Sequence, residues 1–148
     1  LDFGLAKSAS TPSVEEEAAP ARPSQDALDF ITRTGTLLGT PAYMAPEQWR
    51  GRPLPKSDVY SLGCLLYELV SGEAPFQGTL PEVMAAHADR LPARPSIFRM
   101  DLSDRLEDLT MRMLAKDPEL RPSMNQLAGD LGRLARDLAT TEDLQAVG

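Results

Sequence analysis

The chain has 148 residues, enough for one domain with a core, and its 42% hydrophobic and 25% charged residues are ordinary for a globular protein. A net charge of −7 and a pI near 4.7 argue against a surface for nucleic acid or anionic membranes. One cysteine and one histidine exclude an internal disulfide and any site that needs a Cys or His pair. The longest strongly apolar stretch, 62–70, is too short to span a bilayer, and no signal peptide is visible.

The amino-acid composition changes twice within the first third of the chain. Residues 1–7 are compact and apolar, whereas residues 8–29 are rich in Ala, Pro, Ser and Glu and carry few large apolar side chains. Such a segment buries too little surface to offset its ordering entropy, so we expect a disordered insertion there. Residues 30–47 are denser in apolar residues again.

The remainder predicts helices and essentially no sheet. A short helix is expected over 45–50, followed by a long one capped by Ser57 and ended by Gly72. Apolar residues occupy nearly every face of that long helix, which predicts that it is buried all round. Further helices are expected over 81–89, after Ser103 and from Pro122, the last fading into a polar tail over 139–148.

Three sequence runs carry the functional signal. The chain opens on Leu1-Asp2-Phe3-Gly4, and the run 39–47 reads Gly-Thr-Pro-Ala-Tyr-Met-Ala-Pro-Glu. A third run, 117–122, reads Asp-Pro-Glu-Leu-Arg-Pro. In this order the runs resemble the activation segment and lower lobe of serine/threonine protein kinases, and the spacing of the threonines resembles bacterial receptor-like members.

The resemblance implies a mainly α fold, a truncated C-terminal helical lobe of the protein-kinase-like α+β fold. Residues 1–138 would be a partial kinase domain, with the activation segment over 2–47 and the helical lobe over 45–138. The intact kinase would use ATP and Mg²⁺ to phosphorylate Ser or Thr of proteins.

The resemblance also implies roles for the first and second runs. Asp2 would bind Mg²⁺ and, with Phe3 and Gly4, form part of the nucleotide site, because Phe3 sets the active pose and Gly4 lets the backbone turn. Thr40 would support catalysis by holding the catalytic base and the acceptor hydroxyl in reach. The catalytic base itself is not among these residues.

Two further carboxylates have implied structural roles. Glu47 would form a buried ion pair with Arg121, whose planar guanidinium can grip a carboxylate with two hydrogen bonds. Asp58 would brace the catalytic loop of the intact domain. A simpler alternative stays open for Asp58, since a carboxylate in the first turn of a helix is favoured by the helix dipole.

Three threonines ahead of Gly39 are candidate phosphorylation sites, namely Thr34 first, then Thr32, with Thr36 the weakest. A phosphate there would order the segment by docking onto basic groups, and Lys7 could assist. The alternative is that all three are exposed hydroxyls without a role. We interpret the single histidine, His87, as a surface residue of its helix and Cys64 as a small core residue.

The glycine-rich loop, the ATP-pairing lysine and the catalytic aspartate are not among these residues, so we expect a fragment that is inactive alone and lacks its partner lobe. Its exposed apolar surface would make it poorly soluble. We expect a cytoplasmic location, either free or as the cytoplasmic part of a membrane-anchored receptor kinase. Two alternatives stay open, a pseudokinase that docks partners and a non-functional gene remnant.

Overall fold

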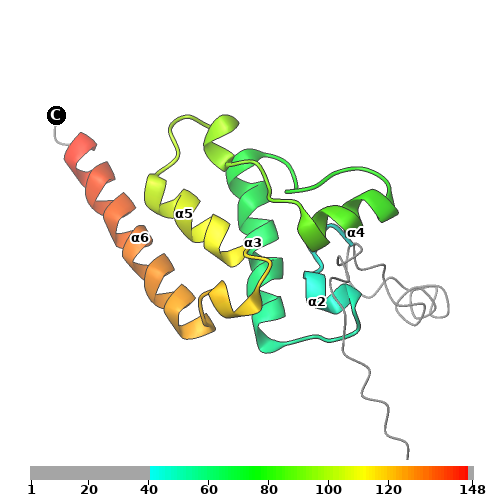
Figure 1. The fold of residues 1–148 in the computed structure, drawn as a ribbon. Helices are drawn as coiled ribbons and strands as arrows, with labels where there is room; N and C mark the ends of the chain where they lie inside the picture. The colour runs from blue at the N-terminus through cyan, green and yellow to red at the C-terminus, as the bar shows by residue number, and fades with distance from the viewer. Residues whose placement is uncertain (1–40, 147–148) are drawn as a thin grey trace, which may run out of the picture.

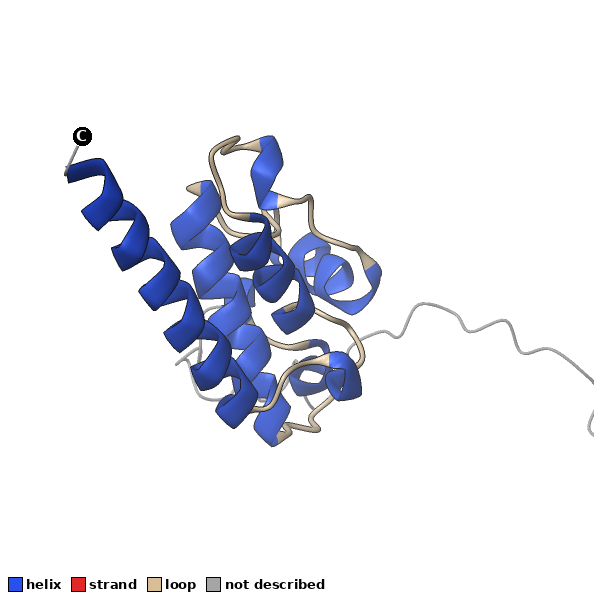
Figure 2. Ribbon diagram, turned by 90° about the vertical axis from the view of Figure 1, so that its left-hand side faces the viewer, coloured by secondary structure: helices blue, strands red, loops and turns tan. Residues whose placement is uncertain are grey.

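The computed structural model describes residues 41–146, with side chains up to residue 140. This part of the chain contains helices and no strand, which confirms the predicted mainly α class (Figure 2). Its elements in chain order are the 3₁₀ turn η1 (Pro41–Tyr43), α2 (Pro46–Trp49), α3 (Pro55–Ser71), α4 (Leu80–Asp89), the turn η2 (Pro95–Ile97), α5 (Asp104–Met113), the turn η3 (Pro118–Leu120) and α6 (Met124–Ala146).

The long helix α3 stands at the centre of the fold. It contacts α5 on one side and the turn η1 on another, and α6 packs on α5 (Figure 1). The short helix α2 contacts α4 on the opposite side of the molecule from α6. Segments that are distant in sequence, the end of the predicted activation segment and the helices that follow it, therefore meet around α3.

Local chemistry sets both ends of α3. The helix begins at Pro55, whose fixed φ and missing N–H suit the first helical position. Ser57 is therefore not the cap that the sequence predicted: it lies in the first turn, where its Oγ accepts a 2.9 Å hydrogen bond from the N–H of Leu54. Gly72 ends the helix with φ +91°, a conformation that favours glycine.

The prediction that α3 is buried all round is wrong for one face. Val59, Tyr60 and Tyr67 are buried. Leu62, Leu65 and Leu69 are exposed at 39%, 46% and 79% of their surface. The three leucines follow one another at helical spacing and so form one exposed apolar stripe. The helical spacing of apolar residues could not distinguish the buried face of α3 from the exposed one, because both faces are apolar.

The core around α3 has two parts. One joins Ala45, Tyr60, Cys64, Tyr67 and Leu114, and the other joins Val59, Leu109, Met113 and Leu127. Cys64 is a core residue, as the sequence predicted. Burial raises the pKa of its thiol to about 12, so the reactive thiolate is scarce near neutral pH.

The remaining helices lie close to their predicted places. Thr79 precedes α4, and its N–H and hydroxyl both donate to the Glu82 carboxylate at 2.7 Å. Ser103 precedes α5, although its hydroxyl makes no capping hydrogen bond. The last helix continues past Leu138 to Ala146, and its C-terminal end extends beyond the rest of the fold (Figure 1). None of the helices over 41–146 has the length and apolarity that crossing a membrane requires.

Gly63 tests how tightly α3 and α5 pack. A Cβ at Gly63 would lie 2.8 Å from Cβ of Met113, whereas one at Gly129 in α6 would meet nothing closer than 3.9 Å. Alanine is favoured over glycine in a helix by about 0.5–1 kcal/mol, so Gly129→Ala should stabilise the chain. Gly63→Ala should instead lower the free energy of unfolding by about 1 kcal/mol or more, because the added methyl overpacks the interface.

Urea unfolding followed by circular dichroism measures both variants. A Gly63→Ala variant as stable as Gly129→Ala would contradict the close approach of α3 and α5.

Candidate functional site

The described end of the predicted activation segment lies against α3 and α4. It consists of the turn η1 and the helix α2, which follow Thr40 directly in sequence. Pro46 occupies the first position of α2, and the N–H of Ala45 donates to the Gln48 side chain at 2.8 Å. The Ala-Pro-Glu run therefore folds as the start of a short capped helix, with Glu47 in its first turn.

Glu47 and Arg121 are 74 positions apart in the sequence, and the fold brings their side chains together. Nη1 of Arg121 donates to Oε1 of Glu47 at 2.6 Å, and Nη2 donates to Oε2 at 3.0 Å. The Arg121 side chain is fully buried and that of Glu47 is 9% exposed. This is the bidentate geometry in which a guanidinium binds a carboxylate best.

Arg121 also binds three backbone carbonyl groups. Its Nε donates to the carbonyl of Ala115 at 2.7 Å, and its two terminal nitrogens donate to those of Lys56 and Lys116 at 3.0 and 3.1 Å. Together with the two bonds to Glu47, this uses all five N–H donors of the guanidinium. One side chain thus joins α2, the start of α3 and the segment that follows α5.

The carboxylate of Glu47 has a second partner, which makes its third hydrogen bond. Oγ of Ser57 donates to Oε1 of Glu47 at 2.6 Å while it accepts from the N–H of Leu54. Burial acts to raise the pKa of Glu47, but the hydrogen bonds from Arg121 and Ser57 outweigh it and hold the pKa below its usual value. Glu47 is therefore ionised at neutral pH, as the ion pair requires.

The turn η1 is held at its C-terminal residue by α3. Oγ of Ser61 donates to the carbonyl of Tyr43 at 2.7 Å, and the Tyr43 hydroxyl donates to the Glu68 carboxylate. The hydrogen bond to Glu68 raises the pKa of Tyr43, and so does burial. Ser61 thus fixes the backbone of Tyr43 to α3, and Glu68, further along the same helix, fixes its side chain.

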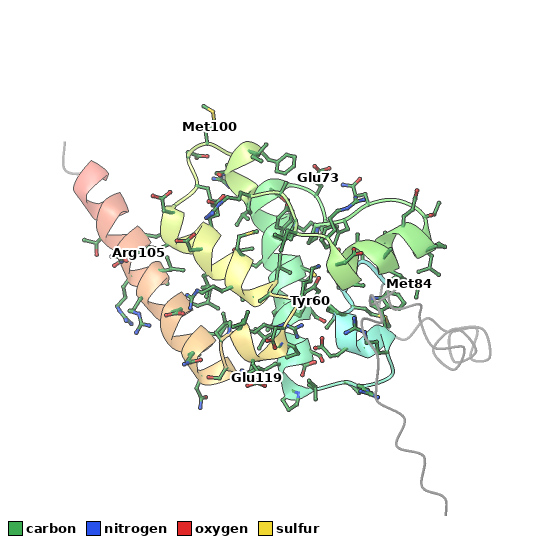
Figure 3. All side chains as sticks on the ribbon, in the orientation of Figure 1. Tyr60, Glu73, Met84, Met100, Arg105 and Glu119 are labelled. Carbon is green, nitrogen blue, oxygen red and sulfur yellow. The ribbon has the colours of Figure 1, made fainter. Side chains whose placement is uncertain are left out.

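His87 is not the surface residue that the sequence predicted, since its side chain is fully buried. Its Nε2 lies 3.0 Å from the carbonyl oxygen of Ala42 in η1, and its Nδ1 lies 2.8 Å from the hydroxyl of Tyr60. A signal was available, because Val83, Met84 and His87 share one face of α4, and the first two are apolar. Tyr60 lies at the centre of the fold (Figure 3).

The other predicted site residues lie apart from this cluster or outside the described residues. Asp58 is exposed in the first turn of α3, and its carboxylate makes no hydrogen bond or ion pair with the other side chains described over 41–140. Among the described side chains, up to residue 140, no three lie together in a way that could hold a metal ion. The predicted positions outside the described residues are Asp2, Phe3, Gly4, Lys7, Thr32, Thr34, Thr36 and Thr40, together with the insertion over 8–29.

Comparison with known proteins agrees with this geometry. Residues 1–130 match the protein kinase domain family. The chain is 38% identical to the probable serine/threonine-protein kinase PknB of Corynebacterium glutamicum over 124 residues, which cover 79% of this chain and 19% of that protein. The chain therefore belongs to the protein kinase family.

Two other relatives point the same way. PknB of Mycolicibacterium smegmatis is 41% identical over 103 residues, covering 68% of this chain and 16% of that protein. PkaA of Streptomyces coelicolor is 37% identical over 149 residues, covering 99% of this chain and 24% of that protein. Both are serine/threonine-protein kinases by name, and the predicted resemblance to bacterial members is confirmed. The chain spans about a fifth of the length of these relatives.

We expect Arg121→Ala to lower the free energy of unfolding by about 3–5 kcal/mol, because it leaves the buried carboxylate of Glu47 without its cation. The matched control is Arg133→Ala in α6, where a side chain that is 65% exposed pairs with Asp130. That control should cost less than about 1 kcal/mol. Chemical unfolding of both variants measures the difference, and equal midpoints would contradict the role given to Arg121.

The ion pair also sets a dependence on pH. Because the pKa of Glu47 is lowered below its usual 4.5, its contribution to stability is complete above that pH and is lost as the pH falls through the lowered pKa. The unfolding free energies of the wild type and Glu47→Gln should differ most near neutral pH and converge below pH 4.5. A difference that stays constant down to pH 3 would contradict this assignment.

Proposed function

We propose that this chain is part of a serine/threonine kinase that transfers the γ-phosphoryl group of ATP to a Ser or Thr hydroxyl of a protein. The observation that carries the proposal is the buried Glu47–Arg121 pair, which fixes the end of the predicted activation segment to the helical lobe. Membership of the kinase family and the names of the bacterial relatives support the same activity.

In this proposal the residues that bind the nucleotide and its metal are those of the first sequence run, 2–4. Asp2 would hold Mg²⁺, and the donor set fits the metal, since Mg²⁺ takes carboxylate oxygens together with phosphate oxygens. Mg²⁺ supplies charge neutralisation at the phosphates of ATP when it is bound. Phe3 would set the position of Asp2, and Gly4 would let the backbone turn beside it.

In this proposal the protein acceptor is positioned by the segment that follows the insertion over 8–29. Thr40 would hold the acceptor hydroxyl near the base, and the anchored turn η1 follows it immediately. Thr34 and Thr32 would be phosphorylated to order the segment, with Thr36 the weaker site and Lys7 an assisting cation. A phosphate brings about two negative charges and acceptor oxygens that bind basic side chains strongly.

The 148 residues would not catalyse the transfer alone, because they contain no glycine-rich loop, ATP-pairing lysine or catalytic aspartate. The exposed stripe Leu62, Leu65 and Leu69 is the surface on which we place the rest of the kinase domain, since an apolar stripe of this kind favours burial. Asp58 precedes Leu62 by four residues on the same face, where it would brace the catalytic loop. Protein substrates and a cytoplasmic location follow from the same proposal.

The test is phosphoryl transfer by the complete protein that contains this segment. With radiolabelled ATP, Mg²⁺ and casein as the acceptor, we expect label on Ser or Thr. Asp2→Asn should reduce the rate to background, because the metal then loses a carboxylate ligand. The control Asp104→Asn changes an exposed carboxylate in α5 and should keep the wild-type rate.

A complete protein that binds partners but transfers no phosphate would overturn the proposal in favour of a pseudokinase. An Asp2→Asn variant with the wild-type rate would overturn the role of Asp2 alone.

A further inference from the structure

The turn η1 is bound from a second side by a buried histidine of α4. The carbonyl oxygen of Ala42, two positions after Thr40, lies 3.0 Å from Nε2 of His87. His87 is fully buried against the rings of Tyr60 and Phe76, whose centroids lie 5.6 and 5.0 Å from that of the imidazole. The imidazole end of this contact is therefore shielded from water, where a lost hydrogen bond is hard to replace.

The partners of the imidazole determine where its proton is. A carbonyl oxygen can only accept, so Nε2 of His87 carries the hydrogen and donates to Ala42. Burial lowers the pKa of His87 to about 4, so the ring is neutral and Nδ1 is an acceptor. The hydroxyl of Tyr60 then donates to Nδ1 at 2.8 Å, which fixes this tautomer.

Lys116 completes the chain of donors. Its Nζ lies 3.3 Å from the Tyr60 hydroxyl oxygen, which accepts from the ammonium while it donates to His87. The same Nζ donates to the carbonyls of Ala86 and His87 at 3.1 and 3.0 Å, at the C-terminal end of α4. Donation thus runs in one direction, from Lys116 through Tyr60 and His87 to the carbonyl of Ala42.

This chain of donors gives the turn a second, independent anchor. Ser61 of α3 binds the carbonyl of Tyr43, and His87 of α4 binds the carbonyl of the residue before it. Two consecutive peptide groups held by two different helices leave the turn little freedom to rotate. An apolar side chain of the same size could fill the space of His87 but could not fix the direction of the Ala42 carbonyl.

We propose that His87 is a positioning residue for the protein acceptor: it orients the turn after Thr40 and thereby sets how efficiently a Ser or Thr hydroxyl is phosphorylated. This inference rests on the proposed kinase activity. His87 acts through the backbone of η1 and does not itself touch the reacting groups.

The experiment uses the complete kinase and three variants. His87→Leu removes the donor to Ala42, His87→Gln returns an N–H donor, and Tyr67→Phe is the control. Tyr67 is a buried residue of α3 whose hydroxyl donates to the carbonyl of Ala93 at 2.9 Å, so the control loses a partly buried hydrogen bond, like that of His87, that does not involve η1.

The kinetic readout separates positioning from general damage. For His87→Leu we expect kcat/KM for an acceptor peptide to fall about fivefold, the effect of one lost hydrogen bond, with KM for ATP and hydrolysis of ATP by water unchanged. His87→Gln should recover most of that loss, and Tyr67→Phe should show none. Equal losses in peptide phosphorylation and ATP hydrolysis, or no recovery with Gln, would overturn the inference.

Hydrogen exchange distinguishes this inference from the kinase proposal. The amides of Tyr43 and Met44 should exchange faster in His87→Leu than in Tyr67→Phe, whether or not the protein transfers phosphate. If phosphate transfer is absent but this difference is present, the proposed function fails and the anchor stands. If exchange is the same in both variants, the anchor itself is overturned.

Discussion

The guanidinium of Arg121 is the group on which the described fold depends. A buried charge is tolerated only when it is paired and fully hydrogen-bonded, and every N–H of this side chain has an acceptor in Glu47 or in a backbone carbonyl. The acceptors come from α2, the start of α3 and the chain after α5. Those segments can therefore satisfy the charge only when all of them are in place, which makes their assembly cooperative.

Tyr60 extends this cooperativity to the turn that follows Thr40. The Arg121 guanidinium lies 4.8 Å from the centroid of its ring, while its hydroxyl joins Lys116 to His87. The same residue therefore touches the ion pair with its aromatic face and the turn's anchor with its polar tip. Burial raises the pKa of the hydroxyl far above its usual value, so it remains a hydrogen-bond donor at any physiological pH.

How much of this was predictable from the sequence differs from residue to residue. The pairing of Glu47 with Arg121 was predictable from the resemblance to protein kinases, which implies a buried ion pair between the two sequence runs that contain them. The burial of His87 could have been read from the apolar face that it shares with Val83 and Met84, but its partners could not, because they are a backbone carbonyl and a distant tyrosine. The exposed face of α3 was missed for a different reason: helical period identifies apolar faces, but not which of them a neighbouring element covers.

The burial of Cys64 allows the opening of this core to be followed by chemical labelling. It is the single cysteine of the 148 residues, it lies between Ala45, Tyr60 and Leu114, and its thiol is fully buried with a raised pKa. An alkylating reagent can therefore reach the sulfur only when α3 separates from Ala45 and Leu114, which pack against it. At low reagent concentration the labelling rate would report the free energy of that opening, and at high concentration its speed.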